Sequence, residues 1–191
     1  MSFVSSSLQP AVSGSLATAD TATSPASLIV GLGNSLLRDD GIGVHAVRRL
    51  AANPPAGTLV LEVGTDIFSA VSWLESVPRV LAIDALDGGG PPGTIYRCHS
   101  SDIWNEQPIT SLHELSLLSV LEFIPRSRWP DIAVLGVQPE LIEFGLELSP
   151  ILQGVLPTVV EAARAITADW ASPRRPAFNQ HQSELCPATM R

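Results

Sequence analysis

The sequence predicts an α/β protein: a three-layer αβα sandwich around a twisted, mostly parallel five-stranded sheet with one strand antiparallel. One pattern along the chain carries this prediction. Short, continuous apolar runs alternate along the chain with segments whose apolar residues recur at helical spacing. Such alternation is typical of a parallel sheet covered by helices on both faces. The 191 residues suffice for one domain, which we place at residues 28–171.

Four apolar runs are expected to form the parallel strands. They are Leu28–Leu32, Thr58–Val63, Arg79–Ile83 and Asp131–Val137. A fifth, shorter strand is expected at Thr94–Cys98. Only the turn-rich ALDGGGPP separates it from Asp84, and a parallel crossover needs about a dozen residues or more. The fifth strand is therefore predicted to be antiparallel and near the edge of the sheet.

Four segments between and after these strands are expected to be helical. They are GIGVHAVRRLAAN (41–53), DIFSAVSWLESV (66–77), HELSLLSVLEFI (113–124) and a long segment from about Leu148 to Trp170. Asp39 or Asp40 stands where the N-cap of the first helix belongs. In the last helix, Pro150 and Pro157 are placed in the lead-in or the first turn, because proline interrupts a helix interior.

Composition excludes several classes of function. A net charge of −8 argues against a nucleic-acid partner. All eleven cationic side chains are arginine, which excludes a P-loop lysine, a Schiff-base enzyme and a Ser-Lys hydrolase. No apolar run reaches the roughly 18 to 20 residues of a membrane span, so we expect a cytoplasmic protein without membrane contact. Residues 1–27, which lack the features of a secretory signal, and residues 172–191 are expected to be a disordered leader and tail.

Polar residues fall where the predicted strands end. Asp39 and Asp40 follow the first strand, Asp84 ends the third, and His113 begins the third helix. In an open parallel sheet, ligands bind beyond the carboxyl ends of the strands. If the strand order begins 2-1-3, the acids line one crevice, which His113 could enter from above. Two carboxylates and an imidazole suit a divalent cation such as Ni²⁺ or Zn²⁺.

Each of these residues also has a purely structural interpretation, and spacing alone leaves both open. Asp40 would cap the first helix, Asp84 would accept backbone N–H bonds at a strand end, and His113 would be an ordinary first-turn residue. His45 is interpreted as solvated surface. GLGNSL lacks the third glycine of a dinucleotide-binding loop, and a G-x-S-x-G nucleophile elbow is absent from the sequence.

Five motifs together carry a family resemblance. In order, they are GLGN-x-L-x-x-DDGIGV, IDAL, PPGTI, SLHELSL and GVQPE…LELSP. Between about Leu28 and Ile166, the chain resembles the hydrogenase maturation endopeptidases, which process the large subunit of [NiFe] hydrogenases. The resemblance implies an α/β sandwich fold and a substrate that is a nickel-loaded large-subunit precursor, whose C-terminal extension is removed by one cut.

The resemblance also implies a metal-binding site. Its ligands would be Asp40, Asp84 and His113, the nickel would be supplied by the substrate, and Asp39 would support the site. A water molecule activated by a carboxylate or the metal is the expected nucleophile. Two alternatives stay open: a non-enzymatic nickel-binding assembly chaperone for the same precursor, and a nucleotide-binding module that uses GLGN.

One loop departs from the family pattern. After the second strand the family commonly has Asp-Gly-Gly-Thr, whereas this chain has Glu62-Val63-Gly64-Thr65. Val63 replaces a glycine that would permit close approach of the backbone. If this loop contacts the substrate peptide, the departure bears on which hydrogenase is processed.

Overall fold

Five strands form one mixed sheet in the computed structural model, which describes residues 25–99, 117 and 119–172. The strands are β1 (Ser27–Leu32), β2 (Thr58–Gly64), β3 (Arg79–Ala85), β4 (Ile95–His99) and β5 (Asp131–Val137). Their order across the sheet is β2-β1-β3-β5-β4, and only β4 runs antiparallel to its neighbour. The five predicted strands, the order beginning 2-1-3 and the antiparallel edge strand are confirmed.

Strand β4 does not pair with β3, although a short loop joins the two strands. Strand β5 lies between them and pairs with both. The connecting loop follows the end of β5, where Leu86 N donates to Val137 O at 2.9 Å and Gln138 N donates to Thr94 O at 2.8 Å. The place beside β3 is thus occupied by β5, which comes after β4 in the sequence.

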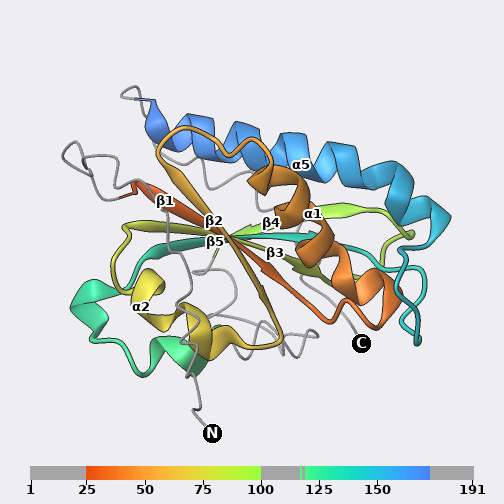
Figure 1. Ribbon diagram of the computed structural model, residues 1–191, viewed down its shortest axis with the longest axis horizontal. Coiled ribbons are helices and arrows are strands. Elements are labelled where there is room, and N and C mark those ends of the chain that lie inside the picture. Colours follow the sequence, from red (N-terminus) through yellow and green to blue (C-terminus); the bar gives the residue numbers. More distant parts are fainter. Residues whose placement is uncertain (1–24, 100–116, 118, 173–191) are drawn as a thin grey trace, which may run out of the picture.

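Helices cover both faces of the sheet, as Figure 1 shows. Alternate residues of the central strands point to opposite faces. In β1, Leu28 and Val30 belong to the cluster packed under α2 (Val71–Leu74), whereas Ile29 belongs to the cluster packed under α1 (Ile42–Ala51) and α5 (Pro150–Ala171). All three side chains are fully buried, which explains why the strand is a continuous apolar run.

The segment predicted as a helix at 66–77 is only partly α-helical. It forms a 3₁₀ turn, η2 (Ile67–Ala70), followed by the single α-helical turn α2. Two serine hydroxyls in it donate to nearby backbone carbonyls, Ser69 to Asp66 O and Ser76 to Trp73 O. Such bonds compete with a regular helical ladder. In the helix predicted at 113–124, residues 113–116 and 118 lie outside the described residues, Leu117 and residues 119–121 are helical, and residues 122–124 form a turn.

The long C-terminal helix α5 is confirmed, but the prediction for one proline is wrong. Pro150 occupies the first turn, after the N-cap Ser149, as expected. Pro157 lies inside the helix. Proline has no backbone N–H, so Pro157 leaves the carbonyl of Gln153 without its usual intrahelical donor. Both residues are exposed, so water can reach that carbonyl. The opposite face of α5 packs on the sheet and holds the helix together.

Candidate active site at the carboxyl ends of strands β1 and β3

Two of the predicted site residues meet around Gly33, which directly follows β1. Asp84 lies near the end of the neighbouring strand β3 and is fully buried, with its Oδ1 accepting a 2.9 Å hydrogen bond from Ala85 N. Gly33 has a φ of +106°. A Cβ atom there would lie 1.8 Å from Asp40 O and 3.5 Å from Asp84 Oδ1. Only glycine therefore lets the acidic loop close onto the end of β3.

Asp40 does not cap the first helix. It belongs to a 3₁₀ turn, η1 (Arg38–Gly41), that precedes α1, and the N-cap of α1 is Gly41. Asp40 is 9% exposed, and its Oδ2 accepts a 2.7 Å hydrogen bond from Asn34 N. The carboxylate is thus held at the carboxyl end of β1 by the backbone of the GLGN turn, and the capping interpretation is wrong.

Gly43 allows the first turn of α1 to rest directly on the ends of two strands. A Cβ atom at this position would lie 2.1 Å from Ile83 O and 2.5 Å from Leu32 O. Leu32 is the last residue of β1, and Ile83 lies near the end of β3. The close approach lets η1, with both its aspartates, lie next to the position of Asp84.

Asp39 is fully buried and binds a distant loop. Its Oδ2 accepts hydrogen bonds from Glu140 N and Leu141 N, both at 2.9 Å, and its Oδ1 accepts one from Ser149 N at 2.7 Å. These donors belong to residues 138–149, hereafter the β5–α5 loop. A carboxylate that accepts three backbone N–H groups replaces the water these groups would otherwise bind. Asp39 therefore joins the β5–α5 loop to η1.

Backbone hydrogen bonds join the same two segments. Arg38 N donates to Gly145 O and Gly145 N donates to Leu36 O, both at 2.9 Å, and Asp39 N donates to Leu141 O at 3.3 Å. Arg38 has a φ of +48°, in the left-handed region that is uncommon for a non-glycine residue. Its Nε also lies 3.1 Å from Glu143 Oε1, an ion-pair distance without hydrogen-bond geometry. The two loops therefore form one unit around the acidic pair.

A cleft of about 250 Å³ opens beside this unit. It is lined by Gly33, Asn34, Ser35, Val44, Glu62, Val63, Gly64, Thr65 and Asp66. Its walls are therefore the GLGN turn after β1 and the end of β2 with the two residues that follow it. Asn34 both lines the cleft and donates to Asp40, so the carboxylate lies directly behind the wall of the cleft.

The segment Glu62–Thr65, which departs from the family pattern and was expected as a loop, is the end of β2 and the first residue after it, and it forms one wall of this cleft. Glu62 accepts two hydrogen bonds from Arg48 of α1, from Nε to Oε2 at 2.8 Å and from Nη2 to Oε1 at 2.7 Å. The bond and charge of Arg48 lower the pKa of Glu62. Val63 is buried and packs into the core under α2. The left-handed conformation falls on Gly64, the last residue of β2, with a φ of +61°, so valine is accommodated without strain.

His45 is not the solvated residue that its place on α1 predicts. It is half-buried, and its Nε2 is enclosed without a hydrogen-bond partner among the described residues. Burial, reinforced by the charge of Arg48, lowers the pKa of His45, while the nearby backbone of Leu146 acts in the opposite direction. The β5–α5 loop covers this side of the helix, which the sequence of α1 alone does not indicate.

The structure thus brings Asp39, Asp40 and Asp84 to one end of the sheet. His113, the third predicted ligand, lies outside the described residues. Within the described ranges, no group of three or more His, Cys, Asp or Glu side chains is arranged to hold a metal ion. Two carboxylates alone are an incomplete ligand set for Ni²⁺ or Zn²⁺. The metal-binding role of Asp40, Asp84 and His113 therefore stays a prediction, as does the supporting role of Asp39.

Sequence reasoning missed several residues that shape the site. Asn34 was only part of the GLGN motif, yet its N–H group positions Asp40. The Arg48–Glu62 pair connects α1 with the cleft wall, and only a match of charges 14 residues apart could have suggested it. Gln138 closes a further network, because its Oε1 accepts from Gly88 N at 2.8 Å and from Tyr96 Oη at 3.1 Å.

These features define a class: an α/β protein with buried carboxylates at the carboxyl edge of a mostly parallel sheet, beside an open cleft. The hydrogenase maturation protease family model matches residues 44–166. The chain is 28% identical to HupD of Rhizobium leguminosarum bv. viciae over 155 residues, which cover 76% of each chain. It is 30% identical to HupD of Rhodobacter capsulatus over 149 residues, covering 74% of this chain and 71% of that protein. Both are described as hydrogenase expression/formation proteins.

Solved structures agree with these sequence matches. The maturation protease HybD of Thermococcus kodakarensis has 31% identity and a TM-score of 0.63, over 73% of this chain and 97% of that chain. The maturating endopeptidase HybD of E. coli has 25% identity and a TM-score of 0.66, over 74% and 91%. The chain belongs to the hydrogenase maturation protease family and is a peptidase. Within the part of the chain that the structure describes, no helix is both long enough and apolar enough to cross a membrane.

Proposed function

We propose that this peptidase removes the C-terminal extension of a nickel-loaded [NiFe]-hydrogenase large-subunit precursor in the cytoplasm. In this proposal Asp40, Asp84 and His113 bind the nickel that the substrate carries. The observation that supports it most directly is the meeting of Asp40 and Asp84 around Gly33. Neither carboxylate caps a helix or sits on the solvated surface, and Asp40 is bonded to Asn34, which lines the neighbouring cleft.

The chemistry of the donors fits a metal that arrives with the substrate. Carboxylate and imidazole ligands suit Ni²⁺, and three protein ligands leave coordination positions for groups of the substrate. A precursor without nickel would offer nothing for these ligands to bind. Recognition of the metal would thus restrict cleavage to precursors that have completed nickel insertion.

Cleavage itself requires a nucleophile and a proton acceptor. The oxygen of a water molecule adds to the scissile carbonyl carbon, and a site carboxylate accepts the proton. The C–N bond then breaks, and the amine leaving group takes up a proton. When bound, nickel supplies Lewis-acid polarisation and positions the substrate. The residues of the chain contribute by holding the peptide in the cleft and the carboxylates at its wall.

The test is a processing assay on purified nickel-loaded precursor. Asp40→Asn, Asp84→Asn and His113→Ala are each expected to slow processing by about 100-fold or more, as for the loss of one group that stabilises a transition state. Asp169→Asn, an exposed carboxylate on α5, is the matched control and should process at the wild-type rate. Circular dichroism checks that each variant is folded. Full processing by the three folded variants would refute the proposed site.

An assembly chaperone on the same fold would give a different result. It would bind the precursor without shortening it, so the intact mass of the large subunit would stay unchanged after incubation. The family assignment favours the peptidase. A mass decrease that equals the C-terminal extension, with wild-type enzyme only, is the expected outcome.

A further inference from the structure

The β5–α5 loop presents large apolar side chains to solvent next to the candidate site. Phe144 is 81% exposed, Leu146 65%, Ile142 57% and Leu141 39%. Two neighbours extend this set. Leu36 accepts a hydrogen bond from Gly145 N through its carbonyl, and Ile151 lies in the first turn of α5; both are at least two-fifths exposed. We refer to these six side chains as the apolar surface.

The loop that carries the apolar surface is fixed rather than loosely attached. Asp39 binds it at both ends, through Glu140 N and Leu141 N near its start and Ser149 N at its end. Between these two ends, Gly145 accepts a hydrogen bond from Arg38 N and donates one to Leu36 O. The side chains are thus held outward by a backbone that is already ordered. A partner that binds them would not have to order the loop first, which is a large part of the cost of association.

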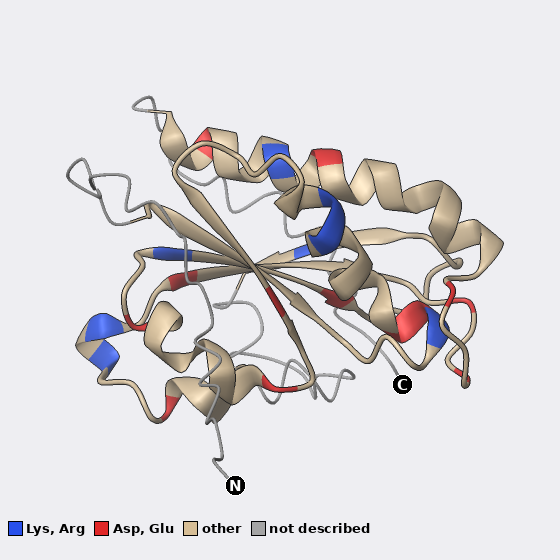
Figure 2. Ribbon diagram, viewed as in Figure 1, with Lys and Arg blue, Asp and Glu red and all other residues tan. Residues whose placement is uncertain are grey.

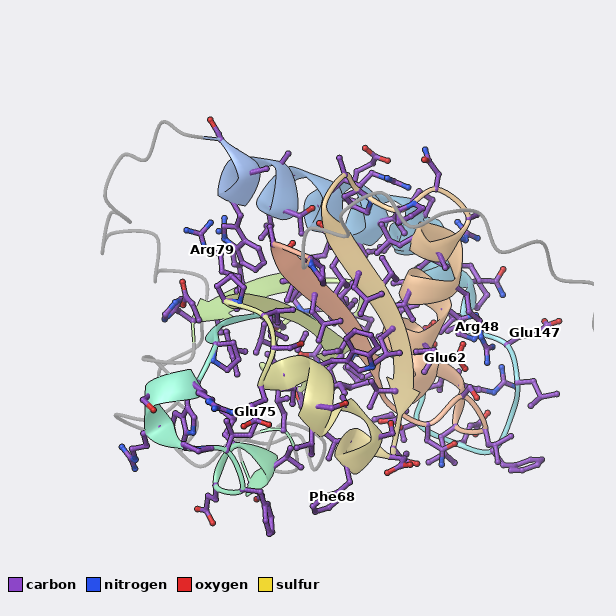
Figure 3. All side chains as sticks on the ribbon, turned by 60° about the vertical axis from the view of Figure 1, so that its left-hand side comes forward. Arg48, Glu62, Phe68, Glu75, Arg79 and Glu147 are labelled. Atoms are coloured by element: carbon purple, nitrogen blue, oxygen red, sulfur yellow. The ribbon has the colours of Figure 1, made fainter. Side chains whose placement is uncertain are left out.

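Acidic residues alternate with the apolar ones. Glu140, Glu143 and Glu147 all lie in the loop and are exposed, and Figure 2 shows the acidic residues gathered there. Arg38 lies at ion-pair distance from Glu143. Glu147 points away from the body of the protein in Figure 3. A complementary partner would present apolar side chains surrounded by lysine or arginine.

The apolar surface is also continuous with the candidate site. Leu36 directly follows Ser35, which lines the cleft, and Asp39 bonds the loop to the turn that carries Asp40. A protein that binds the apolar surface would therefore lie beside the cleft. A second copy of this chain fits less well, because pairing the same surface with itself would oppose the glutamates of the two copies, each copy with a net charge of −8.

We propose that the apolar surface is the docking site for the folded body of the precursor, and that the precursor carries a basic-rimmed apolar patch that binds it. This inference rests on the proposed function. It adds a second contact to the substrate, separate from the peptide in the cleft and from the metal. Docking would then supply affinity, whereas the carboxylates and the cleft would supply the chemistry.

Steady-state kinetics on the nickel-loaded precursor test the apolar part of this surface. Phe144→Ser and Ile142→Ser are expected to raise KM by about tenfold or more, as for an apolar anchor at the centre of an interface, and to leave kcat unchanged. Phe123→Ser is the matched control. Phe123 is 71% exposed, and its segment lies far from the β5–α5 loop in Figures 1 and 3. The KM of Phe123→Ser should therefore equal that of the wild type.

The acidic part is tested by association rates. The double variant Glu140→Gln/Glu147→Gln is expected to bind the precursor more slowly and with a weaker dependence on salt, because it has lost steering charges. Glu122→Gln/Glu161→Gln removes two exposed charges elsewhere and should retain the wild-type salt dependence. Equal rates for the two double variants would contradict the charge complementarity.

Three outcomes separate the possibilities. If the wild type does not shorten the precursor, the proposed function fails. If the wild type processes it and Phe144→Ser keeps the wild-type KM, the docking site is refuted while the proposed function stands. If Phe144→Ser instead converts a dimer to a monomer in analytical ultracentrifugation with KM unchanged, a second copy occupies the surface, and the proposal is refuted as well.

Discussion

Gly33 determines how closely the acidic loop can approach the ends of the strands. Its φ of +106° and the 1.8 Å that would separate an added Cβ atom from Asp40 O leave no room for a larger residue. We expect Gly33→Ala to lower the free energy of unfolding by about 2 kcal/mol or more, from backbone strain and from displacement of Asp40. Urea denaturation followed by circular dichroism measures the change.

Gly154→Ala is the control for this prediction. Gly154 lies in α5, and an added Cβ would have no atom within 4 Å. Alanine should therefore raise the free energy of unfolding by about 0.5–1 kcal/mol, because it is the better helix former. A Gly33→Ala variant as stable as the wild type would show that the turn can rearrange, and that the approach of Asp40 to Asp84 does not depend on glycine.

Asp39 is the second residue on which the local structure depends. Asn at this position keeps the size but can accept hydrogen bonds through only one oxygen, so its amide N–H would oppose a buried backbone N–H donor. We expect Asp39→Asn to lower the free energy of unfolding by about 2–3 kcal/mol, and to make the β5–α5 loop cleavable in limited proteolysis.

The exposed carboxylate of Asp169 provides the comparison. Asp169→Asn should change the free energy of unfolding by less than about 0.5 kcal/mol, as surface substitutions usually do. If Asp39→Asn behaves in the same way and its loop stays resistant to protease, the backbone bonds at Gly145 suffice to hold the two loops together. Asp39 would then be available for a role in the chemistry instead.

At the scale of elements, the three central strands β1, β3 and β5 were predictable because they are buried on both faces and are therefore almost entirely apolar. The edge strands β2 and β4 are only partly buried, and their shorter apolar or alternating runs still indicated them. The sequence signal weakens wherever side chains bond to the backbone, as Ser69 and Ser76 do in the interrupted helix of residues 66–77. It also misplaces Pro157, because local rules do not register that one exposed interruption is tolerated in a helix held by its opposite face.

The junction of η1 with the β5–α5 loop could not be predicted at all. The donors to Asp39 are backbone N–H groups between 101 and 110 residues away along the chain, and a backbone group leaves no residue pattern to recognise. The residue pattern alone therefore does not separate the two aspartates, and only the family resemblance assigned Asp40 as a ligand and Asp39 as its support. In the structure one is surrounded by the donors of a distant loop, and the other is bound by the GLGN turn beside the cleft.

The contact between α1 and the β5–α5 loop predicts a pH dependence of stability. Burial lowers the pKa of His45 below its ordinary value of 6.5, with Arg48 adding to the effect. The unfolded chain therefore takes up a proton more readily than the folded protein as the pH falls below 6.5. The stability that comes from keeping His45 neutral is therefore complete above pH 6.5, and it is lost as the pH falls through 6.5 toward the lowered pKa of the folded protein.

Thermal or urea denaturation at a series of pH values checks this. Between about pH 7.5 and 5.5, the wild type should lose more stability than His45→Gln, which has no proton to take up in this range. Parallel stability curves for the two proteins would mean that His45 is as well solvated as the sequence of α1 alone suggested, and that the loop does not cover it in solution.

At the scale of the whole molecule, the proposed metal ligands and the apolar surface divide substrate recognition into two parts that can be measured independently. The first responds to nickel in the precursor, and the second responds to its folded surface. We expect the wild type to bind nickel-loaded precursor about tenfold or more tightly than nickel-free precursor, a difference of about 1.4 kcal/mol. Biolayer interferometry with both forms of the precursor measures this ratio.

Two variants should alter this measurement in different ways. Asp84→Asn removes a ligand, so it should bring the two affinities close together by weakening binding of the nickel-loaded form alone. Phe144→Ser should weaken binding of both forms by the same factor and preserve their ratio, because the apolar surface does not contact the metal. A wild-type ratio near one would refute recognition through nickel, and a ratio that collapses in Phe144→Ser would mean that docking and metal binding are energetically coupled across the η1 junction.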